Sequence, residues 1–283
     1  MQPSYGATTS GLTSPPLTRT VSFLSDFGLQ DEFVGVVHGV IARLAPDVRV
    51  IDVTHGISAG DIRGGALALT RAVQYLPHGV VLAVVDPGVG TSRKALAVRT
   101  ESGFFVGPDN GLLSPAVAMV GGANAIHSIE NPEVLIPAAG VTFQGRDVFA
   151  PAAALLASGE AEPADLGPAV DPATVKPLLL PLPKVEPPLT TGEVFWIDWY
   201  GNVETNVGPE DLALAGAEAG GELELRVGAT WHPARYVKTF GDVEAGELAV
   251  HVDSAGLIAI SLSGGRADET LSLATGMAVT FRV

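Results

Sequence analysis

The chain has 283 residues, enough to bury a sizeable core in one large domain or two smaller ones. Its 31 acidic residues outnumber its 16 lysines and arginines, giving a formal net charge of −15 that argues against binding to nucleic-acid backbones or anionic membranes. The chain contains no cysteine, which excludes disulfides, thiolate metal sites and a cysteine nucleophile and is compatible with a reducing cytoplasm.

The first 18 residues are rich in Ser, Thr, Pro and Gly and lack the apolar centre of a signal peptide. We predict that residues 1–18 form a disordered tail. Beyond them, no uninterrupted apolar stretch reaches the roughly 18–20 residues that a membrane-spanning helix needs. The expected location is therefore cytoplasmic.

Residues 19–176 alternate between strand and helix patterns. Apolar residues recur at helical spacing over residues 33–44, and this pattern closes before Pro46. The other expected elements are strands at 21–24, 48–53, 79–85, 95–98 and 104–106, and helices from residue 61 and over 149–157. Strands and helices that alternate at this spacing predict an α/β/α domain with a mainly parallel sheet.

A proline-rich stretch, residues 177–190, follows this domain and predicts a semi-rigid spacer. Beyond it the pattern changes to strand-like runs that are separated by glycine-rich turns. These runs occupy residues 193–198, 222–227, 248–252, 257–262 and 278–283. Residues 191–283 are therefore expected to form a C-terminal antiparallel β-barrel domain.

One loop stands out because it follows the buried strand at 79–85. Its sequence, residues 86–93, is DPGVGTSR. Open α/β sheets bind ligands just past the carboxyl ends of their strands, and glycines at such a place permit close backbone approach. Asp86 and Arg93 can face each other across the loop, either as a functional pair or as a plain structural ion pair. The segment is neither a dinucleotide fingerprint nor a P-loop, because the third glycine and the Gly-Lys-Ser/Thr are missing.

Six short segments, taken together, carry a family resemblance. In chain order they are SDFG at 25–28, DVTH at 52–55, DPGVGTSR at 86–93, PDNG at 108–111, TFQGRDVF at 142–149 and DWYGN at 198–202. This set resembles the S-adenosylmethionine (SAM) hydroxide adenosyltransferases, the hydrolase relatives of the fluorinases and chlorinases. The resemblance covers nearly everything from residue 21 to residue 283.

The resemblance implies a fold, an assembly and a reaction. The fold is an N-terminal α/β domain followed by a β-barrel, and the assembly is a homotrimer. In it SAM lies between the first domain of one subunit and the second domain of the next. Water or hydroxide attacks C5′ of the ribose, and adenosine and L-methionine are released. SAM is the substrate, and no cofactor is expected.

The resemblance also implies three catalytic residues. Asp86 would accept a hydrogen bond from the attacking water, and Arg93 would stabilise developing hydroxide charge. The third family position is a histidine, and this chain has Gln144 there, which cannot carry a proton near neutral pH. We interpret Gln144 as a positional substitute. Two alternatives stay open: a SAM-binding protein without turnover, and an adenosyltransferase that uses another small nucleophile.

The expected substrate contacts come from both domains. Asp26 matches the family acid that accepts both ribose hydroxyls, although a plain turn aspartate is the alternative reading. Asp198 and Asn202 match residues that hold the amino and carboxylate groups of methionine. Tyr200 takes the place of an aromatic residue near adenine.

Three further matches lie near the C-terminus. Ser254 matches a contact to the methionine carboxylate, and Ser263 falls where an asparagine usually meets adenine. Gly265, near Ser263, is expected to let the backbone approach the ligand closely.

The halogenases provide a contrast. They carry Tyr where this chain has Asp86, Trp where it has Gly60, and Ser where it has Gly145. A carboxylate at position 86 would repel a halide, so halogenation is not expected.

The remaining charged groups are assigned supporting roles. Asp52 and His55 lie near a strand end and could suggest a metal site or a triad, but they are expected to cap and pin the loop around Gly60. Arg146 and Asp147 are expected to form a local pair that supports Gln144. The six histidines show no spacing typical of metal ligands, so no metal is expected.

Overall fold

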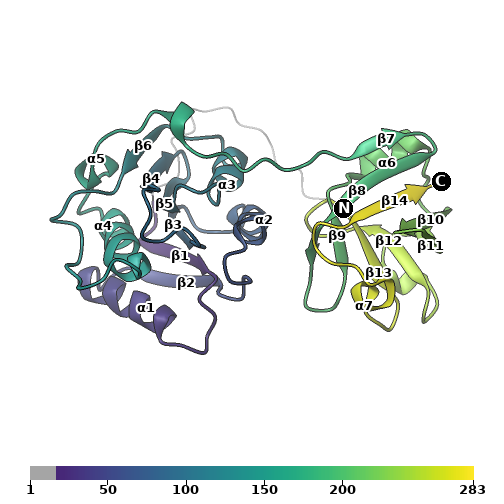
Figure 1. Cartoon of the computed structure of the whole chain (residues 1–283), viewed down its shortest axis with the longest axis horizontal. Coiled ribbons are helices and arrows are strands. Elements are labelled where there is room, and N and C mark those ends of the chain that lie inside the picture. The colour runs from purple at the N-terminus through teal and green to yellow at the C-terminus, as the bar shows by residue number, and fades with distance from the viewer. Residues whose placement is uncertain (1–16) are drawn as a thin grey trace, which may run out of the picture. The chain divides into compact units, whose positions relative to one another are not determined.

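The computed structural model describes residues 17–283, and the chain divides into two compact units (Figure 1). One unit runs to Leu178, and the other comprises Leu179–Val283. Most of the predicted tail, residues 1–16, lies outside the described residues. Of its last two residues, Thr18 donates a backbone hydrogen bond to the carbonyl of His78, 2.6 Å away.

The first unit contains one sheet and its covering helices. Its strands are β1 (Thr20–Ser25), β2 (Arg49–Thr54), β3 (Gly79–Val84), β4 (Ala95–Thr100), β5 (Gly103–Pro108) and β6 (Ala125–Ser128). Its helices are α1 (Phe33–Leu44), α2 (Ile62–Val73), α3 (Ser114–Met119), α4 (Ala150–Ser158) and α5 (Pro163–Leu166), with short turns η1 (Gly145–Phe149) and η2 (Pro172–Thr174).

The strand order β2-β1-β3-β5-β4-β6 confirms a mainly parallel sheet. The pairs β1–β2, β1–β3 and β3–β5 are parallel, whereas β4 runs antiparallel to both of its neighbours. Helices α1 and α4 pack together, and α2 packs with α3 (Figure 1). The apolar side chains of β1 and β3 that face α1 and α4 are almost completely buried, which explains the continuous apolar runs in the sequence.

Two stretches differ in detail from the sequence expectation. The predicted helix at 149–157 is α4, and it is preceded by the π-helical turn η1, which begins at Gly145. The expected proline-rich spacer, residues 177–190, contains the short strand β7 (Lys184–Glu186) and the first residues of β8 (Leu189–Ile197). Backbone pairing between β7 and β8 therefore orders part of a segment that composition alone describes as a spacer.

The second unit is a closed barrel, as predicted. Its remaining strands are β9 (Val203–Thr205), β10 (Glu222–Val227), β11 (Thr230–Tyr236), β12 (Leu248–Val252), β13 (Ile258–Leu262) and β14 (Ala278–Arg282). Its helical segments are α6 (Pro209–Ala215), η3 (Phe240–Asp242) and α7 (Ala267–Leu271). Pairing of β14 with β8 closes the ring, and β11–β12 is a parallel pair among antiparallel ones.

Within residues 17–283, none of the helices has the length and apolar character required to cross a membrane.

The close approach of β3 and β5 yields a stability prediction. Gly103 has φ +132°, and a Cβ there would lie 2.0 Å from the carbonyl oxygen of Gly79. Gly121 also has a positive φ, +98°, but a Cβ there would meet open space. Gly103→Ala should therefore lower the free energy of unfolding by at least about 3 kcal/mol, and Gly121→Ala by only about 1–2 kcal/mol. Urea unfolding followed by circular dichroism measures both, and equal losses would contradict the packing described here.

Candidate active site

The carboxyl ends of three neighbouring strands meet at one edge of the first sheet. Leu24 pairs in register with Thr54, and Ser25 with Val84, so β1, β2 and β3 end side by side. The residues that follow these ends are Asp26, His55 and Asp86. This edge is where open parallel sheets hold their ligands.

Arg93 folds back onto the loop and binds Asp86 with two nitrogens. Its Nε donates to Oδ1 of Asp86 over 3.0 Å, and its Nη2 donates to Oδ2. The same Nη2 also donates to Oε1 of Gln144, which comes from a segment 51 residues further along the chain. The structure thus brings together the three residues that were predicted to be catalytic.

The chemistry of these groups fixes how Gln144 is oriented. A guanidinium has only donors, so it must face the amide oxygen of Gln144. The NH2 group of this planar amide is therefore turned away from Arg93. Gln144 adds a hydrogen-bond donor beside the carboxylate of Asp86, and not a proton acceptor.

The pair is shielded from water. The side chain of Arg93 is 5% exposed and that of Asp86 is 6% exposed. The guanidinium also lies over the buried ring of Phe149, with its Cζ 5.4 Å from the ring centroid. Low exposure strengthens the attraction between the charges, and it makes removal of either partner costly.

Asp26 lies at the same edge and is held by the neighbouring loop. Its Oδ2 accepts a hydrogen bond of 2.7 Å from the backbone nitrogen of Gly60. Gly60 has φ +75°, and a Cβ there would lie 3.5 Å from Pro87, next to Asp86. The loop at Gly60 therefore lies against both acidic residues, and any larger side chain at position 60 would lie against Pro87.

Gln144 is positioned by the start of a helix. It immediately precedes the π-helical turn η1, and π-helical turns are frequent at functional sites. A Cβ at Gly145 would lie 2.9 Å from Phe27, so this segment packs directly on the SDFG turn. The expected pair is present: Nε of Arg146 donates to Oδ1 of Asp147 over 2.6 Å, and this hydrogen bond raises the pKa of Arg146.

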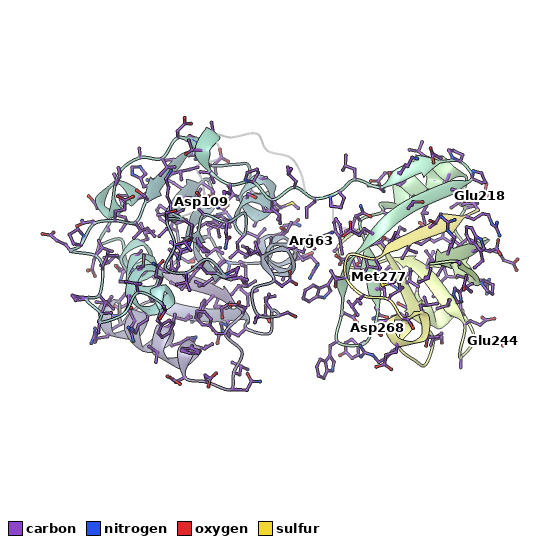
Figure 2. All side chains as sticks on the ribbon, viewed as in Figure 1. Arg63, Asp109, Glu218, Glu244, Asp268 and Met277 are labelled. Atoms are coloured by element: carbon purple, nitrogen blue, oxygen red, sulfur yellow. The ribbon has the colours of Figure 1, made fainter. Side chains whose placement is uncertain are left out.

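Asn110 is a supporting residue whose role the sequence did not reveal. Its Nδ2 donates to the carbonyl of Val85 over 2.8 Å, directly before Asp86. The neighbouring Asp109 accepts a hydrogen bond of 2.8 Å from the backbone nitrogen of Lys176 (Figure 2). In the sequence this PDNG segment contributed to the family resemblance without a stated role, whereas in the fold it secures the end of β3.

His55 contacts the SDFG turn through both its backbone and its side chain. Its carbonyl accepts from the backbone nitrogen of Gly28 over 2.9 Å, and its Nδ1 lies 2.7 Å from the hydroxyl of Ser25. Asp52 and His38 lie beside it, forming a group of ligand-type side chains. Burial alone would raise the pKa of Asp52, but the neighbouring His55 and His38 outweigh it and lower that pKa.

In the second unit, Asp198 organises its own turn. Its Oδ1 accepts from the backbone nitrogens of Tyr200 and Asn202, at 2.8 and 2.9 Å, and its Oδ2 accepts from Nδ2 of Asn202 at 2.7 Å. Tyr200 is 75% exposed and Trp199 is 89% exposed. The turn thus presents two aromatic rings to the surroundings of this unit.

The other predicted contacts of this unit fall into two places. Ser263 and Gly265 follow the end of β13, whereas Ser254 lies in the turn before it. The five residues of β13 separate these places by about 16 Å. Asp268 follows Gly265 by three residues (Figure 2). Its backbone N–H donates to the carbonyl of Gly201 over 3.2 Å, so the Asp198 turn lies near this end of β13. Ser254 is the one that stands apart.

Comparison with known proteins agrees with the two-domain fold. Residues 21–167 match the SAM hydroxide adenosyltransferase N-terminal domain, and residues 192–280 match the corresponding C-terminal domain. An (R)-S-adenosyl-L-methionine hydrolase of Salinispora tropica is 48% identical over 92% of this chain and 96% of its own length. A fluorinase of an Actinoplanes species is 26% identical over 92% of this chain and 96% of its own. A crystal structure of an uncharacterized conserved protein from Thermotoga maritima, 37% identical, has a TM-score of 0.86 and covers 93% of this chain and 100% of its own.

The burial of this pair predicts that substitutions of Asp86 and Arg93 have non-additive effects on the free energy of unfolding. Asp86→Ala leaves the Arg93 charge buried without its partner and should cost about 3–5 kcal/mol of unfolding free energy. The double variant Asp86→Ala/Arg93→Ala should lose less than the sum of the two single losses, because the buried charge goes with its partner. Urea unfolding of the three variants gives this coupling.

The matched control is Asp47→Ala. Asp47 pairs with Arg19 at 3.5 Å, and the two side chains are 85% and 61% exposed. Loss of that pair should change the free energy of unfolding by less than about 1 kcal/mol. Additive losses at Asp86 and Arg93, of the same size as this control, would show that the pair is not electrostatically coupled.

Proposed function

This chain belongs to the SAM hydroxide adenosyltransferase family, and we propose that it hydrolyses S-adenosyl-L-methionine to adenosine and L-methionine. The observation that carries the proposal is the shielded contact of Arg93 with both Asp86 and Gln144 at the carboxyl end of β3. We further propose that the reaction takes place in the cytoplasm and needs no cofactor.

The chemistry asks little of the protein beyond orientation. The sulfonium of SAM leaves as a neutral thioether, so no general acid is needed. A water oxygen forms the new bond to C5′, and the electrons of the C5′–S bond stay with the sulfur of methionine. What the site must supply is one water that is fixed in line with the breaking bond.

The three residues have separate tasks in this reaction. Asp86 accepts a hydrogen bond from the water and so turns an oxygen lone pair toward C5′. Arg93 stabilises negative charge as the water loses its proton. Both oxygens of Asp86 already accept hydrogen bonds from Arg93, so Asp86 orients the water and the proton passes on to solvent. The NH2 of Gln144 donates to the water oxygen from the side.

The same residues favour water over halide. Asp86 places a negative charge where an anion would have to sit, and the fluorinase relative is only 26% identical to this chain. Gly60 and Gly145 stand where the halogenases have larger side chains. A Cβ at Gly145 would lie only 2.9 Å from Phe27, and Gly60 has a positive φ of +75°, which disfavours a side chain there. Hydrolysis is therefore favoured over halogenation.

The substrate contacts support a site shared between subunits. Asp26 has one oxygen bonded to Gly60, and we propose that its carboxylate also accepts the ribose hydroxyls. We propose that the Asp198 turn, Ser254, Ser263 and Gly265 belong to the second half of the site. In a homotrimer these would come from the neighbouring subunit. The exposed rings of Trp199 and Tyr200 support this assignment, because large exposed aromatic groups mark interaction surfaces.

The role of Gln144 predicts the pH dependence of the reaction. Because Gln144 does not titrate, the pH–rate profile of the wild type should lack an imidazole limb between about pH 5 and 8. Gln144→His should keep activity, and it should add such a limb to the profile. The measurement is the rate of adenosine release at saturating SAM.

Two further variants test whether the NH2 donor of Gln144 or its acceptor oxygen is the group that the reaction needs. Gln144→Glu keeps an oxygen for Arg93 but loses the NH2 donor, and Gln144→Ala loses both. Each should lower kcat by about 10²-fold, as expected when one aligned donor is removed. A wild type that binds SAM without releasing adenosine, and that gains turnover only as Gln144→His, would contradict this assignment and favour a binding protein.

Subunit sharing predicts complementation between two inactive variants. Asp86→Ala damages the first half of the site, and Asp198→Ala damages the second. When the two are co-expressed and mix at random, each site draws its halves from two subunits, so about a quarter of the sites should be intact. The mixed protein should recover activity in that proportion, as measured by adenosine release.

Each variant alone, at the same total concentration, is the control. A mixed oligomer that stays as inactive as either parent would place both halves of the site within one chain. A monomer in light scattering would lead to the same conclusion.

A further inference from the structure

Three side chains next to the proposed site gather ligand-type atoms that the reaction does not use. They are His38 on α1, Asp52 in β2 and His55 just after that strand. Nε2 of His38 lies 2.8 Å from Oδ1 of Asp52, and Nε2 of His55 lies 3.0 Å from the same oxygen. One ligand atom from each residue falls within 4.8 Å of the others.

His55 is held with one nitrogen aimed into this group. Its side chain is 3% exposed, and its Nε2 makes no hydrogen bond, although it lies close to Asp52. Its Nδ1 lies 2.7 Å from the hydroxyl of Ser25. In the tautomer that carries its proton on Nδ1, the Nε2 of His55 has a lone pair, and a neutral imidazole nitrogen of this kind is a common metal ligand.

The side chains of His38 and Asp52 are partly exposed, so they can move and an ion can reach them from solvent. The side chain of His38 is 36% exposed and that of Asp52 is 45% exposed. In a tetrahedral zinc site the ligand atoms are about 2.0–2.2 Å from the ion and therefore about 3.3 Å from one another. The two histidine–Asp52 distances, 2.8 and 3.0 Å, are a few tenths of an ångström shorter than this spacing. The partly exposed side chains of His38 and Asp52 can move around the fixed His55, and water can fill the remaining position.

We propose that His38, Asp52 and His55 bind one divalent transition-metal ion. Two imidazoles and one carboxylate suit zinc, cobalt or nickel, whereas magnesium and calcium prefer oxygen ligands. The ion would replace the proton in the hydrogen bond between His38 and Asp52. The chain's net charge of −15 favours the approach of any cation.

The sequence did not indicate that His38 belongs to this group, because the three residues are not spaced as a motif. Asp52 and His55 are three residues apart, but His38 lies on the preceding helix, and only the packing of α1 beside β2 brings it in. An ion here would tie α1 to the end of β2. It would also fix His55, which holds the SDFG turn through Ser25 and Gly28.

Metal binding to the purified full chain tests this directly and needs no measurement of turnover. Chelator-treated protein is titrated with Co²⁺, followed by visible absorption, and with Zn²⁺ in competition with a chromophoric chelator. We expect one ion per chain. His38→Gln and Asp52→Asn should each weaken binding by more than about 100-fold, because each removes a direct ligand. His38 is half-exposed, so that variant should fold normally, and circular dichroism checks this.

Two controls match these changes. Asp47→Asn removes one exposed negative charge from the same unit, and His232→Gln removes one imidazole from the other unit. Both should bind the metal as the wild type does. Absence of saturable binding at one ion per chain, or binding that survives both His38→Gln and Asp52→Asn, would overturn the proposal and leave a hydrogen-bonded cluster only. Because binding is measured without SAM, this result is independent of the proposed hydrolysis.

Discussion

The site depends on the contact between Arg93 and Asp86, which water can barely reach. Two guanidinium nitrogens of Arg93 donate to the two carboxylate oxygens of Asp86. The guanidinium also donates to the amide oxygen of Gln144. Desolvation offsets much of the attraction in such a pair, so its main contribution is orientation and not stability. A fixed carboxylate with a donor beside it can hold one water in one direction, which is what displacement at a sulfonium-bearing carbon requires.

The rest of the first unit maintains this orientation. Asn110 secures the carbonyl of Val85, the last residue before Asp86, and Phe149 supports the Arg93 guanidinium from the end of η1. The turn η1 sets Gln144 at the start of that same helical segment. These supports come from two segments far apart in the sequence, one after β5 and one around η1, and they meet beside the carboxyl end of β3. The site is therefore a property of the parallel sheet and not of any single motif.

The sequence predicted much of this arrangement, and its limits have physical causes. Local periodicity was sufficient for the α/β pattern, the barrel and the position of Asp86 at a strand end. It could not show that Gln144 meets Arg93, since 51 residues separate them, and that assignment came from the family resemblance. The strand β11 was missed; it contains Pro233, a residue that weakens a strand pattern. The contact of His55 with Ser25 and that of His38 with Asp52 likewise depend on tertiary packing.

The central claim is that a solvent oxygen, held by Asp86 and Arg93, displaces methionine from C5′. Mass spectrometry of the adenosine formed in water enriched in heavy oxygen tests this most directly. The account predicts that the wild type incorporates the heavy isotope from the solvent into the 5′-hydroxyl of every adenosine released. Adenosine without the label, or a product that carries a group other than hydroxyl at C5′, would show that another nucleophile attacks and would contradict the account.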